Sequence, residues 1–119
     1  MNFDNMEKET RKVLAEIESD TAVATALLTS EDTVHIAYCE TFQNCILCKG
    51  YTGMDTINAV KNSSILKMIT LYKRNEQTDR EVPCFWLRNY LYDTNHDNIN
   101  AEVMLMSGEI CSLKVFFRK

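Results

Sequence analysis

The stretch Ile-Asn-Ala-Glu-Val-Met-Leu-Met-Ser-Gly-Glu-Ile-Cys-Ser-Leu-Lys-Val-Phe-Phe, residues 99–117, carries the clearest structural pattern of the chain. Folded about residues 107–109, its two halves predict a β-hairpin with one apolar face. The pairs expected on that face are Leu105–Cys111, Val103–Leu113, Ala101–Val115 and Ile99–Phe117. On the other face Glu102 would meet Lys114. Successive side chains of a strand point to opposite faces, so a slip of one residue would mix the two faces.

The composition is that of an ordinary globular protein. The chain has 119 residues, of which 45% are hydrophobic and 25% charged. This length predicts a single domain over residues 1–119 with one hydrophobic core. The net charge of −4 argues against a nucleic-acid partner, which needs a basic surface.

The chain shows no pattern that would take it to a membrane or through a secretion pathway. No apolar run is long enough to span a bilayer. Met1-Asn2-Phe3-Asp4 lacks the basic and apolar segments of a signal peptide. Five cysteines, an odd number, indicate a reducing compartment, so we expect a cytoplasmic protein.

Apolar spacing predicts the elements of the first half. A helix over residues 4–19 begins with Asp4 and Glu7, which are spaced as a capping box. A second, shorter helix is expected over residues 22–27, although the alternation there also permits a strand. Alternating residues predict a strand over 33–42, followed by a returning strand over 45–51. A short helix over 54–60 closes this half.

The second half is expected to be mainly strand. Residues 65–73 fit a strand better than a helix because a turn precedes them and a polar run follows. Residues 74–81 form that polar loop. Residues 82–92 are rich in aromatic residues, which favours a strand with Pro83 at its start. With a turn over 93–98, the predicted order is two helices, two strands, one helix and four strands, an α+β arrangement with a mainly antiparallel sheet.

Three short segments resemble the NTF2-like superfamily, especially its small SnoaL-like members. Gly53 and Ile57 within residues 50–57 look like that family's Gly-x-x-x-Ile entry to a helix. Residues 107–117 are similar to its closing strand, and residues 27–34 to its acidic helix–strand junction. The resemblance implies an NTF2-like cone, in which a curved, mixed but mainly antiparallel sheet wraps around the N-terminal helices. Such a cone would enclose a hydrophobic pocket.

The resemblance also implies a homodimer formed through the open face of the sheet. The outer face of the predicted hairpin would expose more apolar surface than a solvated sheet needs. The candidate interface residues are Met104, Met106, Ile110 and Phe116. The alternative is a scatter of exposed apolar residues, which is common on monomers.

The family's catalytic pattern is missing from the matching positions. In the steroid-isomerase branch of the family, two acids act in proton transfer. The resemblance places them at Ile36 and Ala101, neither of which can transfer a proton. Glu40 and Glu102 are nearby substitutes, although alternation points Glu102 outward. We therefore expect no assured catalysis.

Two other groups of residues could carry a function. Cys45 and Cys48 have redox spacing, but a strand and Gly50 follow them, so we expect ordinary thiols and neither a metal nor another cofactor. The residues expected to line a ligand pocket are Tyr38, Trp86 and Tyr90, with Arg88 as an anion contact. Core packing is the alternative for these side chains.

The expected function is binding of a small hydrophobic ligand or a protein partner. The first alternative is a SnoaL-type isomerase, cyclase or dehydratase that uses unusual acid–base residues. The second is a dimerisation or regulatory module whose cone is filled. The volume inside the cone would separate these readings.

Overall fold

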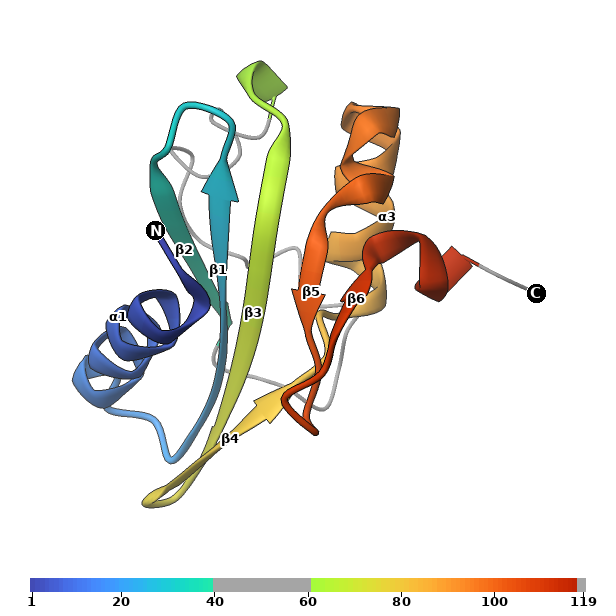
Figure 1. The fold of residues 1–119 in the computed structure, drawn as a ribbon. Coiled ribbons are helices and arrows are strands. Elements are labelled where there is room, and N and C mark those ends of the chain that lie inside the picture. The colour runs from blue at the N-terminus through green and yellow to red at the C-terminus, as the bar shows by residue number, and fades with distance from the viewer. Residues whose placement is uncertain (40–60, 118–119) are drawn as a thin grey trace.

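The computed structural model describes residues 1–39 and 61–117, apart from the side chain of Trp86 (Figure 1). A six-stranded sheet forms the centre of this part, with the strand order β2-β1-β3-β5-β6 and with β4 paired to β3. The strands are β1 (Thr21–Thr29), β2 (Val34–Cys39), β3 (Ile65–Arg74), β4 (Gln77–Glu81), β5 (Glu102–Met104) and β6 (Ile110–Ser112). The helices are α1 (Phe3–Glu16) and α3 (Phe85–Thr94), with 3-10 turns at His96–Asn100 and Leu113–Phe117. Strands β3 and β5 run parallel, and the other strand pairs are antiparallel.

Two hydrophobic cores lie on opposite faces of the sheet. Strand β1 supplies both, because its side chains alternate between the faces. Ala22, Ala24 and Ala26 belong to the core under α1. Val23 and Leu27 belong to the other core, which contains Leu87 and Leu91 of α3 and is called the α3 face below. The small alanine side chains allow α1 to pack closely on the sheet, and α1 contacts both β1 and β3.

Helix α1 is fixed at both ends by side chains. At its start, the Asn2 side chain accepts a hydrogen bond of 2.9 Å from the Asn5 amide. At its end, the Lys73 ammonium of β3 donates to the carbonyls of Leu14 at 3.1 Å and Ile17 at 2.5 Å. The last carbonyls of a helix have no partner within the helix, so Lys73 supplies both hydrogen bonds and a favourable charge.

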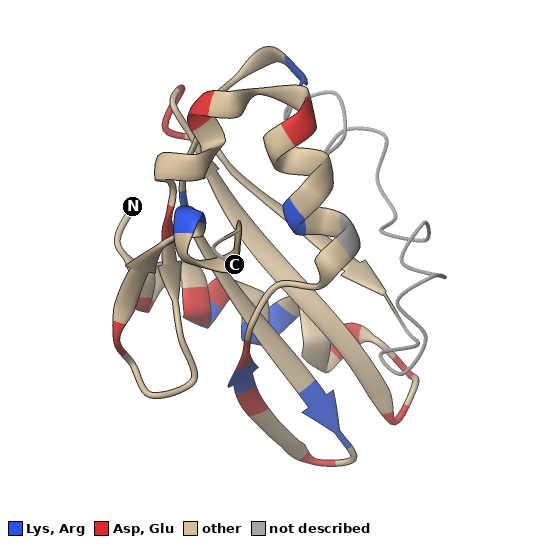
Figure 2. Cartoon of the chain, turned by 90° about the vertical axis from the view of Figure 1, so that its right-hand side faces the viewer, with Lys and Arg blue, Asp and Glu red and all other residues tan. Residues whose placement is uncertain are grey.

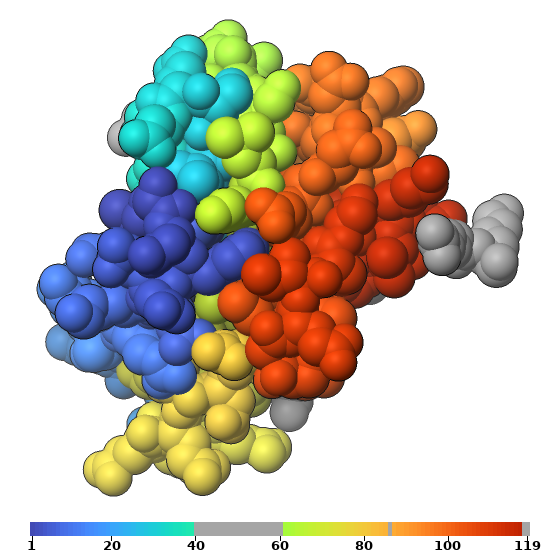
Figure 3. Space-filling view, in the orientation of Figure 1, coloured from blue at the N-terminus to red at the C-terminus, as the bar shows by residue number. Residues whose placement is uncertain are grey.

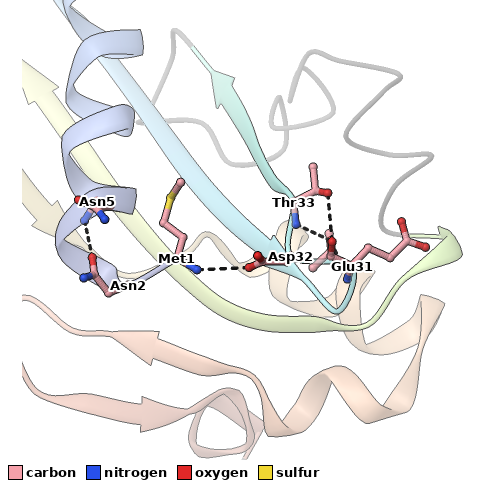
Figure 4. Close-up of polar contacts among 7 residues, drawn as sticks. Met1, Asn2, Asn5, Glu31, Asp32 and Thr33 are labelled. Atoms are coloured by element: carbon pink, nitrogen blue, oxygen red, sulfur yellow. Dashed lines mark hydrogen bonds and ion pairs between the residues drawn. The ribbon is translucent and has the colours of Figure 1, made fainter.

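The turn between β1 and β2 also meets the start of the chain (Figure 4). Asp32 occupies this turn with a φ of 61°, and its carboxylate pairs with the Met1 amine at 3.3 Å. The Thr33 hydroxyl donates to the Glu31 carbonyl. Because Asp32 is exposed, the pair contributes little free energy.

A second connection joins α1 to the β3–β4 hairpin. The Glu7 carboxylate accepts a hydrogen bond of 2.6 Å from Nε of Arg80 in β4. Gly108 has a φ of +90°, and a Cβ there would lie 3.2 Å from Nη1 of Arg80. In the space-filling view the β3–β4 hairpin projects below both α1 and the β5–β6 turn (Figure 3).

The predicted NTF2-like cone, with its two N-terminal helices, is wrong. Residues 22–27, expected to be helical, lie in β1, and residues 82–92, expected to be a strand, contain most of α3. Strand β1 is central and buried on both faces, so it lacks the polar–apolar alternation of a half-exposed strand. The described part has one helix before the first strand, and helices cover both faces of an open sheet.

Several local predictions are confirmed. The predicted helix over 4–19 overlaps α1, and the predicted strands over 33–42 and 65–73 overlap β2 and β3. The predicted polar loop over 74–81 instead contains β4. The strand over 45–51, the helix over 54–60, and the motif residues Gly53 and Ile57 lie outside the described residues.

The closing hairpin exists, but it is shorter than predicted and shifted in register. Val103 pairs with Cys111, and Glu102 pairs with Ser112 in place of Lys114. The shift is two residues, so each side chain keeps its predicted face. The predicted pairs beyond the strand ends are absent because Ile99 and Leu113 lie in 3-10 turns.

None of the helices in the described part is both long and apolar enough to cross a membrane.

Candidate functional site

One end of the α3 face gathers polar side chains from neighbouring strands. Thr25 of β1 lies opposite Thr70 of β3, which lies opposite Glu81 of β4. In the next row on the same face, Tyr72 lies opposite Asp79. Residues directly opposite each other in a ladder share a face of the sheet. The chain leaves β4 at Glu81 and enters α3 at Phe85, with three residues between them.

The two threonines form a buried hydroxyl pair. Their Oγ1 atoms lie 2.8 Å apart, and both residues are 0% exposed. A buried hydroxyl without a partner costs about 1–3 kcal/mol, so each threonine requires the other. The pair therefore anchors a polar strip inside an otherwise apolar core.

A shallow groove, called the polar groove here, opens beside this strip. Its lining residues are Tyr72, Arg74, Gln77, Asp79, Arg80, Glu81 and Met106. The Glu81 carboxylate accepts a hydrogen bond of 2.9 Å from the Val82 amide, which orients it. Figure 2 shows residues of both charge signs on the β3–β4 hairpin, whereas the middle of the sheet is largely uncharged. The groove thus offers donors and acceptors to a polar ligand.

The start of α3 follows β4 in the chain. Cys84 is the N-cap residue, and its Sγ accepts a hydrogen bond of 3.4 Å from the Leu87 amide. Its carbonyl accepts from the Arg88 amide at 3.0 Å. Leu87 is 3% exposed and belongs to the core of the α3 face.

Arg88 lies on α3, four residues after Cys84. Its guanidinium lies 4.8 Å from the ring centroid of Phe116 and 5.8 Å from that of Phe85. Within the described residues, its Nε is buried and has no hydrogen-bond partner. Arg88 therefore packs between two rings instead of facing an open cavity.

Three described cysteines lie around the core of the α3 face. They are Cys39, Cys84 and Cys111, and no disulfide joins any two of these three. Burial raises the pKa of the Cys111 thiol above its ordinary value. Across the described ranges, no three histidine, cysteine, aspartate or glutamate side chains are placed to hold a metal ion together. Cys45 and Cys48 lie outside these ranges.

The structure does not bring the predicted pocket residues together. Tyr38 packs against the core under α1, whereas Tyr90 packs against the core of the α3 face. Arg88 and Tyr90 lie on a helix, not on a strand. Trp86 lies in the first turn of the same helix, and its side chain is not among those that the structure describes. These residues do not line one cavity as predicted, and their role in ligand binding is untested.

The predicted dimer residues also separate. Met104 is 8% exposed in the core under α1, and Phe116 is half-buried against the other core. Met106 and Ile110 are 61% and 50% exposed and keep their predicted place on the surface. The dimer itself remains a prediction. Ile36 and Ala101 no longer count as positions of a missing acid–base pair, because the NTF2-like resemblance alone assigned them that role.

Sequence reasoning missed Thr25, Thr70, Glu81 and Cys84. One signal was available for the last of these. Leucines at 87 and 91 are four apart and share a helix face, and Pro83 marks a boundary before them because proline is excluded from helix interiors and central strands. The facing threonines had no such signal, because their pairing depends on the register of β1 and β3.

Comparison with known proteins identifies the fold. No family model matches the chain, and no curated protein matches its sequence. The structure of the cytidine deaminase from Mycobacterium leprae matches with a TM-score of 0.72 and 15% identity, over 100% of this chain and 99% of that one. The cytidine deaminase from Bacillus anthracis matches with a TM-score of 0.69 and 14% identity, over 95% of this chain and 84% of that one.

These matches overturn the NTF2-like resemblance and the function expected from it. The chain has the fold of the cytidine deaminases, with a mixed sheet between helices and no cone. At this level of identity the matches show the fold alone. The expectation of a hydrophobic ligand held inside an NTF2-like cone is therefore wrong.

Proposed function

We propose that this chain binds a pyrimidine nucleoside in the polar groove along β4. The observation that carries the proposal is the position of the groove. It lies along β4, the strand that precedes α3 in the chain, in a fold matched over nearly its whole length by two cytidine deaminases. Cytidine, the nucleoside in the names of these proteins, is the ligand class to test first.

The chemistry of the groove suits such a ligand. A cytosine base presents an exocyclic amino donor beside ring acceptors, and a ribose presents hydroxyls. Glu81 is half-buried and held by the Val82 amide, so its carboxylate is an oriented acceptor. The half-buried Tyr72 ring offers an apolar surface against which a base can pack.

Calorimetric titration with cytidine tests the proposal. The wild-type chain is expected to bind cytidine and uridine in preference to adenosine. Glu81→Gln should weaken binding by about tenfold, which corresponds to about 1.4 kcal/mol for one lost charged hydrogen bond. Glu76→Gln is the matched control, because it makes the same charge change in the hairpin turn outside the polar groove.

The absence of heat with either pyrimidine nucleoside at millimolar concentration would refute the proposal. An equal loss of affinity in both glutamate variants would instead show a non-specific effect of charge.

We also retain the homodimer as a proposal, supported by the exposed Met106 and Ile110 beside the edge strand β6. Ile110→Asp should halve the mass measured by light scattering, whereas an unchanged dimer mass would exclude this interface. The reducing cytoplasm stays the proposed location, supported by the odd number of cysteines, five in total.

A further inference from the structure

We infer that the start of α3 is a structural helix cap and not half of a catalytic zinc site, so that the proposed nucleoside would be released without deamination. The inference rests on the proposed function for its ligand, but its zinc argument is independent of it. Zinc-dependent deaminases carry the signature His-x-Glu with Pro-Cys-x-x-Cys, in which the two cysteines and the histidine, or a third cysteine, bind the metal. In this chain the residues at the start of α3 read Pro83-Cys84-Phe85-Trp86-Leu87.

Leu87 stands where the signature requires the second thiolate. Its side chain has no atom that binds a metal. It is 3% exposed and packs in the core of the α3 face, three residues after Cys84 on the same helix. Helix α3 therefore contributes one thiol to this region in place of two, and the second position belongs to the hydrophobic core.

Cys84 already has a role in the fold. Its Sγ accepts the Leu87 amide at 3.4 Å, and its carbonyl accepts the Arg88 amide at 3.0 Å. The Sγ contact satisfies one of the backbone donors that a helix start leaves without a partner, and the carbonyl accepts the first hydrogen bond within the helix. The presence of Pro83-Cys84 at the start of α3 is thus explained by helix capping without any metal.

The acid–base group of the signature is missing from the sequence as well. In zinc deaminases a glutamate two residues after the first ligand moves the protons of the reaction. None of the glutamates in the 119 residues follows a histidine or a cysteine at that spacing. The residues two positions after Cys45 and Cys48 are Leu47 and Gly50. A zinc ion held in some other way would therefore still lack this partner.

The residues present thus do not fit the deaminase zinc site. Hydrolytic deamination needs a metal-activated water and a proton carrier, and this chain lacks one ligand and the carrier of the signature. What remains at this end of the sheet is the threonine pair, the polar groove and a capped helix. Such a site can hold a pyrimidine nucleoside and exchange it unchanged.

Elemental analysis of the full chain tests the inference without reference to nucleoside binding. The protein is produced in zinc-supplemented medium as wild type, Cys84→Ser and Cys111→Ser, and zinc per chain is measured after gel filtration. Cys111 is the matched control, because it is another part-buried thiol packed on the same core. We expect far less than one zinc per chain in all three proteins and no change of melting temperature with a chelator.

Stoichiometric zinc that disappears in Cys84→Ser and persists in Cys111→Ser would overturn the inference. Conversion of cytidine to uridine by the wild-type protein would also overturn it, and liquid chromatography measures this directly. Cytidine binding without zinc or conversion would support both proposals. Low zinc without cytidine binding would refute the nucleoside proposal alone and leave the inference on α3 standing.

Discussion

On the α1 face of the sheet, the alanines of β1 meet a helix that is capped by Asn2 and Lys73 and connected to β4 through Glu7 and Arg80. On the α3 face, the same strand presents Thr25 to a second threonine, and the helix opposite starts from a cysteine. The polar contacts of the first face join elements to each other. Those of the second face lie beside a groove and the thiols of Cys84 and Cys111.

This difference indicates how the two faces divide their roles. Side chains on the α1 face have their partners within the chain, so changes there, apart from changes of the groove-lining Arg80, should alter stability alone. Side chains at the end of the α3 face border the polar groove, so changes there should alter stability and ligand binding together. The following variants test this division.

The largest effect is expected from shortening one core leucine on each face. Leu14 is 1% exposed under α1 and Leu87 is 3% exposed on the α3 face. Each change to alanine should lower the free energy of unfolding by about 2–5 kcal/mol, through lost burial and a cavity. Urea denaturation measures the loss. Under conditions where both variants remain folded, only Leu87→Ala should weaken cytidine binding.

The threonine pair should show strong coupling. Thr25→Val or Thr70→Val alone leaves one buried hydroxyl without its partner. Each change should lower the free energy of unfolding by about 1–3 kcal/mol. The double variant replaces both hydroxyls with methyl groups and should cost much less than the sum of the two single changes. A double-mutant cycle from denaturation curves measures this coupling. Additive losses would show that the 2.8 Å contact contributes nothing.

A smaller effect is expected at the end of α1. Lys73→Met keeps the aliphatic stem but removes the donor to two helix carbonyls, and should cost about 1–2 kcal/mol. Lys67→Met is the control, because Lys67 lies on the same face of β3 and its ammonium lies 5.3 Å from the centroid of the Phe3 ring. Equal losses in the two variants would contradict a capping role for Lys73. Neither variant should change cytidine binding.

The smallest effect concerns the pH dependence of stability. Burial raises the pKa of Cys111 in the folded state, so the folded state holds this proton more tightly than the unfolded state does. The resulting contribution is complete below the ordinary thiol pKa and is lost as pH rises through the folded value. Denaturation between about pH 7 and about pH 10 should therefore show a decline that is shallower in Cys111→Ala. An identical decline in both proteins would show that other groups cause it.

The sequence predicted the elements whose two sides differ in polarity. Helix α1 buries Met6, Thr10 and Leu14 at helical spacing and exposes most of the residues between them, so its pattern is readable. The closing hairpin kept its predicted faces for the same reason. Its register was shifted by two residues, because a shift of two preserves the faces and the pattern cannot detect it.

The elements that were predicted wrongly do not have one polar and one apolar side. Strand β1 is buried on both sides, and its alanines favour a helix by propensity. Helix α3 carries Phe85, Tyr90 and Tyr92, residues that favour strands by propensity, yet Leu87 and Leu91 pack it as a helix against the core. The polar strip could not be predicted, because it depends on residues from β1, β3 and β4 whose register only the folded sheet defines.

The parallel pairing of β3 with β5 has a consequence for the order in which the molecule assembles. Strands β1 and β2, and strands β3 and β4, are neighbours in sequence joined by short turns, so each hairpin can form early from local contacts. Strand β5 reaches β3 at Lys67 and Met68 only after β4, α3 and a 3-10 turn have been traversed. Closing that long loop is entropically costly until α3 has docked. The edge of the sheet formed by β5 and β6 should therefore be the last part of the described chain to fold and the first to open.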